Sequence, residues 1–157
     1  MNFHSPPTMV RQMKLSAYSD YSLRVLMQAA VRSPHRITVD EVAGTFGISR
    51  NHLVKIVHDL GRSGYLETYR GIGGGFTLGQ PADEIGVGNI VRLCEEGESV
   101  IECTHRREGP CRLRPVCQLK TVIDEASAAF FEVLDQYSLA DLVAKPSRLR
   151  HVLGLSL

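Results

Sequence analysis

Apolar residues recur three and four positions apart along much of the first 60 residues, which is the spacing of amphipathic helices. One such run starts at Asp20 and predicts a helix to about Arg32, where Ser33-Pro34 ends it. Its apolar positions are Tyr21, Leu23, Val25, Leu26, Ala29 and Ala30. Because Asp20 directly precedes this run, it is a candidate N-cap of the helix.

Two further helices are predicted next, separated by a turn of about three residues. Thr38 and Glu41 have the spacing of a capping box, which marks a helix start, and Gly47 suits the left-handed conformation that ends a helix. Ser49 is then placed to cap a third helix, which runs to about Gly64. Two capped helices joined by a short turn around a glycine predict a helix-turn-helix.

Two short β-prone runs, YLETYR and FTLG, follow the third helix and flank the glycine-rich run GIGGG. This pattern predicts a β-hairpin with a glycine tip. A hairpin directly after a helix-turn-helix is the wing of a winged-helix domain, and the third helix then takes the place of a recognition helix. The glycine run does not fit a nucleotide-binding loop, because no Lys-Ser/Thr pair and no helix follow it.

The predicted recognition helix and wing form a candidate surface for double-stranded promoter DNA. Arg50, Asn51 and His52 lie in the first turn of the helix, the part that reaches base edges in the major groove. Lys55 and Arg70 are better placed for phosphate groups. The candidate DNA-binding residues are Ser49, Arg50, Asn51, His52, Lys55, Arg70, Gly73 and Gly74.

The second half of the chain predicts a short helix in ADEIGVGNIVRLCEE, a cysteine-bearing loop, and one long helix from about Val116 to Tyr137. The long helix carries a continuous apolar stripe. The stripe consists of Leu119, Val122, Ile123, Ala126, Phe130, Val133, Leu134 and Tyr137. Too little of the chain remains to cover it, so we expect a second subunit to do so, giving a homodimer. The run SLADLV predicts a last short helix.

These elements divide the chain into four segments. Residues 1–12 are expected to be a disordered extension, with Met1 and Met13 both candidate start residues. Residues 13–80 form the winged helix-turn-helix domain, residues 81–144 the cluster-binding loop and dimerisation helix, and residues 145–157 a flexible basic tail. The predicted fold class is therefore mainly α with a small β wing.

Charge and hydropathy narrow the possible partners. The formal net charge is only +1, but residues 1–80 hold nine Lys or Arg and five Asp or Glu, so a polyanion is expected to bind this half. No apolar run approaches the roughly 20 residues that span a bilayer, and the N-terminus lacks a signal-peptide pattern. We therefore expect a cytoplasmic protein that does not bind membranes.

Three cysteines, Cys103, Cys111 and Cys117, fall in one short loop and are the main candidates for metal chemistry. Thiolates that converge from one loop are typical ligands of a metal ion or an iron–sulfur cluster. An odd set completes neither a group of disulfides nor the four-thiolate shell of a structural zinc site. A fourth ligand from elsewhere, or an open position, is therefore expected. An iron–sulfur cluster is favoured over zinc, with 4Fe-4S favoured over 2Fe-2S, and Cys94 is interpreted as a buried structural thiol.

The chain resembles the NsrR family of nitric-oxide-sensing repressors, a group of iron–sulfur winged-helix regulators, over about residues 13–144. The resemblance rests on KLSAYSDYSLRVLMQAA, VAGTFGISRNHLVKIVHDLGRSGYLETYRGIGGGFTL, the cysteine loop and LKTVIDEASAAFFEVLDQYSLADLV. It implies a homodimer with one cluster per subunit that binds a palindromic operator and releases it when nitric oxide nitrosylates the cluster. It also implies that the three loop cysteines ligate the cluster and, in one branch, that Asp20 of the other subunit is the fourth ligand.

Two departures and two alternatives qualify this expectation. The related cluster-assembly regulators carry a histidine two residues beyond the last cysteine, where this chain has Leu119, which argues against that branch. The wing has Ile72 where a charged residue is common. An iron-responsive branch has similar cysteine spacing, so an iron- or redox-responsive regulator of the same fold is the main alternative. An iron–sulfur redox enzyme or electron carrier is a more distant one, because no substrate pocket is evident, and we expect no enzymatic activity.

Overall fold

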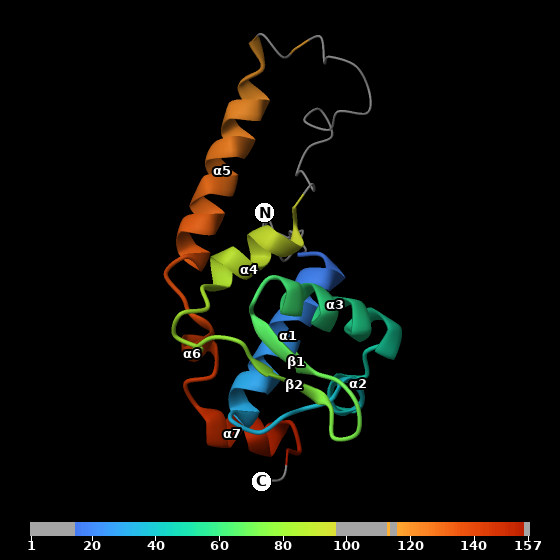
Figure 1. Cartoon of the computed structure of the whole chain (residues 1–157). Helices are drawn as coiled ribbons and strands as arrows, with labels where there is room; N and C mark the ends of the chain where they lie inside the picture. Colours follow the sequence, from blue (N-terminus) through green and yellow to red (C-terminus); the bar gives the residue numbers. More distant parts are fainter. Residues whose placement is uncertain (1–14, 97–112, 114–115, 156–157) are drawn as a thin grey trace, which may run out of the picture.

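The computed structural model describes residues 15–96, 113 and 116–155 of the chain. The predicted extension 1–12 and the cysteines Cys103 and Cys111 lie outside these residues. Figure 1 shows a helical body with one small hairpin, and one long helix that projects from the body. The elements are α1 (Ala17–Arg32), α2 (Val39–Phe46), α3 (Arg50–Arg62), β1 (Leu66–Tyr69), β2 (Gly75–Leu78), α4 (Val87–Cys94), α5 (Gln118–Leu134), α6 (Leu139–Leu142) and α7 (Pro146–Val152).

Helices α1 to α4, the hairpin and the start of α6 enclose the core of the body. Leu26, Leu53 and Phe76, which come from α1, α3 and β2, are all essentially inaccessible to solvent. The helix-turn-helix signals are confirmed: Thr38 Oγ1 accepts from the amide of Glu41 at 3.2 Å, and Glu41 Oε2 accepts from the amide of Thr38 at 2.7 Å. The expected fold class, mainly α with a β wing, is therefore confirmed.

The start of α1 differs from the prediction. Ser16 caps this helix, because its Oγ accepts from the amide of Ser19 at 3.1 Å. The N-cap interpretation of Asp20 is wrong: Asp20 lies inside the first turn, where its carboxylate pairs with Arg24 at 2.9 Å. The apolar pattern misplaced the start because the first turn holds few apolar residues. Ser49 does occupy the N-cap position of α3, but its side chain makes no capping hydrogen bond.

The wing is a two-stranded antiparallel hairpin with Leu66 opposite Leu78 and Tyr69 opposite Gly75. The segment before α2 adds a third short pairing, because the amide of Ile37 donates to Phe76 O at 3.0 Å and the amide of Phe76 donates to Ile37 O at 2.8 Å. Gly75 makes this approach possible. It has a φ of 138°, and a Cβ there would lie 2.5 Å from the carbonyl oxygen of Ile37. The hairpin base is thus joined to the body.

Helix α5 is held at its C-terminal end and is otherwise uncovered. Arg92 of α4 makes two 2.6 Å hydrogen bonds to the carboxylate of Asp135, and its guanidinium lies 4.4 Å from the ring centroid of Phe131. Gly88 leaves room for Asp135, because a Cβ at residue 88 would overlap that carboxylate. The helix is shorter at both ends than the predicted 116–137, and none of its side chains is buried.

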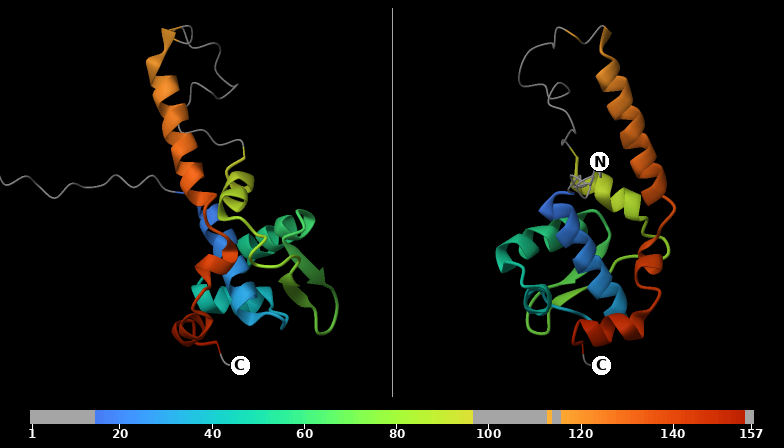
Figure 2. Two further views of the ribbon diagram at one scale, coloured as in Figure 1. Left: turned by 90° about the vertical axis from the view of Figure 1, so that its left-hand side faces the viewer. Right: turned by 180° about the vertical axis from the view of Figure 1, so that it is seen from behind.

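The C-terminal segment also differs from the prediction. A flexible tail is wrong for residues 146–152, which form α7 beside the C-terminal end of α1 (Figure 2). Pro146 occupies the first turn, where a missing N–H costs nothing. The guanidinium of Arg150 donates to Val31 O at 3.3 Å, which satisfies a carbonyl at the end of α1. Helix α7 was not predicted because Val31, which anchors it, lies far from it in the sequence. In the described part of the chain, no helix is long and apolar enough to cross a membrane.

Candidate functional site

Helix α3 presents its first turn to solvent. Leu53, Ile56 and Leu60 are buried against the body. Because of the helical period, Arg50, Asn51 and His52 then lie on the exposed side, as does Lys55. The structure therefore brings the candidate base-reading residues together on one exposed turn.

Helices α1 and α2 hold several of these exposed side chains. Arg50 Nε donates to Asp40 Oδ1 of α2 at 2.8 Å. The ring of His52 stacks on Tyr21 of α1, with centroids 6.4 Å apart. Lys55 Nζ lies 5.7 Å from the ring centroid of a second α1 tyrosine, Tyr18. The directions of the α3 side chains therefore depend on the two helices behind it.

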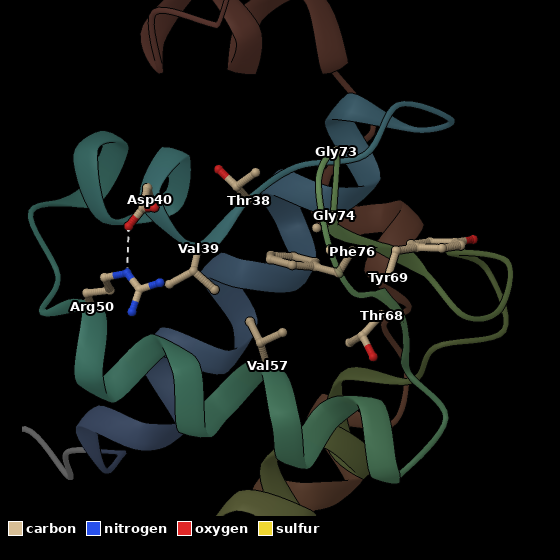
Figure 3. Close-up of a pocket in the computed structure, with 12 residues that line it drawn as sticks. Thr38, Val39, Asp40, Arg50, Val57, Thr68, Tyr69, Gly73, Gly74 and Phe76 are labelled. Atoms are coloured by element: carbon tan, nitrogen blue, oxygen red, sulfur yellow. Dashed lines mark hydrogen bonds and ion pairs between the residues drawn. The ribbon is translucent and has the colours of Figure 1, made fainter.

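A groove of about 510 Å³ opens between the start of α2, helix α3 and the wing. Figure 3 shows Asp40 and Arg50 on one side of it, Tyr69, Gly73 and Gly74 on the other, and apolar side chains between them. The groove residues are Thr38, Val39, Asp40, Arg50, Val57, Thr68, Tyr69, Gly71, Gly73, Gly74, Gly75 and Phe76. Two of the predicted wing residues, Gly73 and Gly74, thus face the same space as Arg50.

Arg36 and Tyr69 belong to this surface although the sequence patterns did not single them out. The guanidinium carbon of Arg36 lies 3.7 Å from the ring centroid of Tyr69, and Arg36 Nη1 donates to Gly73 O at 3.3 Å. The one sequence feature that could have indicated Arg36 is its place directly before Ile37, the first apolar residue after the loop SPHR. Arg70 is exposed next to Tyr69, and Ile72 at the tip is fully exposed.

Replacing Arg36 with alanine is expected to weaken DNA binding about 3- to 30-fold, because a cation–π contact of about 0.5–2 kcal/mol that orders the wing is lost. Fluorescence anisotropy on a duplex at several salt concentrations would measure it. Arg36→Lys should keep the salt dependence but not the full affinity, since lysine lacks the planar stacking group. The matched control is Arg62→Ala at the other end of α3, and equal losses in Arg36→Ala and Arg62→Ala would contradict a role in the wing.

The candidate cluster ligands are only partly described. Cys117 is half-buried at the N-cap of α5, where the partial positive charge of the helix end favours an anionic ligand. Asp20 is 46% exposed and paired with Arg24. Cys103 and Cys111 fall outside the described residues, and within those residues no group of three metal-ligating side chains occurs. A set of three loop thiolates fits an iron–sulfur cluster in its donor chemistry.

The first turn of α1 touches both the segment ahead of the cysteine loop and helix α3. Glu95, the C-cap of α4, accepts from the amide of Ser16 at 2.8 Å and from the hydroxyl of Ser19. Burial opposes ionisation of Glu95, but the hydrogen bonds from Ser19 and Ser16 outweigh it and lower its pKa. In the same turn, Tyr18 donates to Asp59 of α3 at 2.6 Å.

The pKa shifts of Tyr18 and Asp59 keep this bond in its charge-assisted form. Burial, and then the hydrogen bond to Asp59, raise the pKa of Tyr18. The bond from Tyr18 is the largest cause that lowers the pKa of Asp59. The tyrosine therefore stays a donor and the aspartate an ionised acceptor, and charge-assisted bonds of this kind are stronger than neutral ones.

Cys94 lies at the end of α4, half-buried against α1. Burial raises the pKa of its thiol, and the hydroxyls of Ser22 and Ser19 offset only part of this effect. A protonated thiol packed against a helix is a poor metal ligand. The position supports the interpretation of Cys94 as a structural residue.

Comparison with known proteins gives one family and several close relatives. Residues 15–145 match the family model Rrf2, described as an iron-dependent transcriptional regulator. The HTH-type transcriptional regulator NsrR of Bacillus subtilis is 45% identical over 132 residues, which cover 83% of this chain and 90% of that protein. NsrR of Bacillus licheniformis is 39% identical, covering 90% of this chain and all of that protein. Among solved structures, oxidised CymR of Staphylococcus aureus has a TM-score of 0.65 at 31% identity, covering 83% and 95% of the two chains.

Proposed function

This chain belongs to the Rrf2 family of transcriptional regulators, and from that premise we propose that it is a cytoplasmic repressor that binds promoter DNA as an iron–sulfur homodimer and releases it in response to nitric oxide. It is a regulator rather than an enzyme. The observation that carries the proposal is the exposed polar first turn of α3, whose Arg50 lines one groove together with the glycine tip of the wing. A helix of this kind enters the major groove, and a wing beside it contacts the sugar–phosphate backbone.

Helix α5 supports the homodimer. Leu119, Val122 and Val133 are 59%, 58% and 54% exposed on a helix that stands away from the body (Figure 1). Apolar side chains of this size in one stripe are stabilised when a second copy of the helix covers them. A two-fold dimer would present two copies of α3 and so match a palindromic operator, as the resemblance implies.

The cluster would be held by Cys103, Cys111 and Cys117, with Asp20 of the other subunit as a fourth ligand. Cys117 supports this because it ends the loop at the start of α5, the helix proposed to form the dimer. When bound, a cluster of this kind supplies iron that reacts with nitric oxide. An aspartate is a weaker iron ligand than a thiolate, so Asp20 would leave one iron open to exchange.

The first turn of α1 is the proposed link between the cluster and DNA. Glu95 joins this turn to the segment that enters the cysteine loop, and Tyr18 joins it to Asp59 of α3. Movement of the cysteine loop can therefore reach the recognition helix through two short hydrogen bonds. Changes in the spacing of two recognition helices are sufficient to lose an operator.

An anaerobic titration with nitric oxide tests the proposal. Cluster absorbance and binding to operator DNA are followed in the same samples of the cluster-loaded protein. We expect the absorbance to bleach and the DNA to be released together, at a few equivalents of nitric oxide per cluster. Bleaching without release of DNA would contradict the proposal.

The second candidate is an iron-responsive regulator of the same fold, favoured by the description of the matching family as iron-dependent. The same samples separate the two candidates when they are treated with an iron chelator. If chelation releases DNA while nitric oxide does not, the iron-responsive candidate replaces the first.

A further inference from the structure

Asp40 is a carboxylate on the surface that the proposed function turns toward DNA. It lies in the first turn of α2, is 73% exposed, and lines the same groove as the wing glycines. A carboxylate at this place opposes binding to a polyanion, because it adds repulsion with phosphate groups. If such a residue also strengthens binding to particular DNA sequences, it raises the selectivity of the protein although it weakens binding overall.

Its contact with Arg50 gives that effect. Asp40 Oδ1 accepts from Arg50 Nε at 2.8 Å, and Figure 3 shows the two side chains meeting at the edge of the groove. In the part of the chain that the structure describes, the two terminal nitrogens of Arg50 have no hydrogen-bond partner. An arginine held by Nε retains its Nη1 and Nη2 edge, and this edge can donate two parallel hydrogen bonds to O6 and N7 of guanine.

The ion pair contributes little to holding the fold. Arg50 and Asp40 are 62% and 73% exposed, and an ion pair this exposed contributes little to stability. Helices α2 and α3 are joined by their core instead, where Val42 and Leu53 are fully buried. The conformational effect of the pair is therefore local to the Arg50 side chain.

We propose that Asp40 is a specificity-determining residue of the DNA site: it orients Arg50 to read a guanine in each half-site and repels DNA that offers no such guanine. The inference rests on the proposed function, since it requires α3 to enter the major groove. It assigns to one residue both the attractive and the repulsive part of sequence selection.

The test separates specific from non-specific binding. The cluster-loaded, full-length protein is used without oxygen to enrich bound sequences from a random duplex library, and affinity is then measured for the enriched duplex and for an unrelated one. The variants are Asp40→Ala, which removes both the charge and the acceptor oxygen, Arg50→Ala and the double variant. Asp83→Ala is the matched control, because it removes the same charge at an exposed position outside the groove. Thermal melting confirms that each variant is folded.

We expect Asp40→Ala to shift the two affinities in opposite directions. Binding to the unrelated duplex should tighten about 3- to 10-fold, because one more arginine charge is free for phosphate. Preference for one guanine per half-site should fall about tenfold, and Arg50→Ala should lower it by the same factor. The guanine preference of the double variant should be no lower than that of Arg50→Ala alone. Asp83→Ala should change neither quantity.

Three results would overturn the inference. An unchanged guanine preference in Asp40→Ala would remove the role of the carboxylate in orienting Arg50. Equal losses in both affinities would show that Asp40 has only a structural role. If the unsubstituted protein enriches no sequence at all, the proposed DNA-binding function fails first, which distinguishes that case from the other two.

Discussion

Replacing Cys117 with alanine should abolish the cluster and the response to nitric oxide while the winged-helix body stays folded. The substitution removes one of three loop thiolates, and a cluster cannot be retained by two cysteines and a carboxylate as it is by the full set. The body should be unaffected, because its core is built from α1 to α4, the wing and the start of α6, and no side chain of α5 is buried in it. Visible absorbance, iron content and nitric-oxide-dependent release of DNA are the measurements.

Cys94 provides the matched control for Cys117. It is a half-buried thiol packed against α1 and lies outside the three-cysteine loop. Cys94→Ala should keep the full absorbance and the nitric oxide response, at a cost to the free energy of unfolding of about 1 kcal/mol. A Cys117→Ala protein with normal absorbance, or a Cys94→Ala protein without it, would overturn this ligand assignment.

Val122→Asp on α5 should convert the proposed homodimer to a monomer and weaken operator binding by about 10²- to 10⁴-fold. The side chain of Val122 is 58% exposed in the single chain, so the fold does not depend on it. In a two-fold interface, however, the change buries two unpaired carboxylates, which costs several kcal/mol. The loss in DNA affinity follows because the second half-site no longer binds at the high effective concentration that a linked pair provides. Sedimentation and anisotropy would measure the two effects.

Thr121→Asp is the control for this change. Thr121 is the preceding residue, is also exposed in the single chain, and at about 3.6 residues per turn lies on the opposite side of the helix from Leu119 and Ala126. It should leave the molecular mass and the operator affinity unchanged. If Thr121→Asp and Val122→Asp dissociate the dimer equally, the stripe is not the interface.

Local signals predicted most of the fold. The capping box of Thr38 and Glu41, the left-handed glycine at Gly47 and the glycine-rich hairpin tip each act over only a few residues, so the sequence displays them directly. The cap at Ser16 is equally local but was hidden, because the apolar pattern that located α1 starts one turn later. Helix α7 was missed for a different reason, since Arg150 anchors it to a carbonyl at Val31 that no sequence pattern relates to it.

The candidate site was likewise predicted only in part: its exposed residues were, but the contacts that orient them were not. The helical period alone predicts that Arg50, Asn51 and His52 share an exposed turn of α3. The contacts that orient them come from other elements: Asp40 from α2, Tyr21 from α1. Such partners are set by how helices cross, and the spacing of residues within one helix carries no information about them.

The double hydrogen bond between Ile37 and Phe76 affects the entropy of DNA binding. It fixes the base of the wing in the free protein, so the backbone left to be ordered by a duplex is at most that between Tyr69 and Gly75. Ordering the backbone costs about 1–2 kcal/mol per residue, and a hairpin without this anchor would add its strands to that cost. Ile37 therefore preorganises the wing: part of the backbone entropy that DNA binding would otherwise cost is lost already when the chain folds.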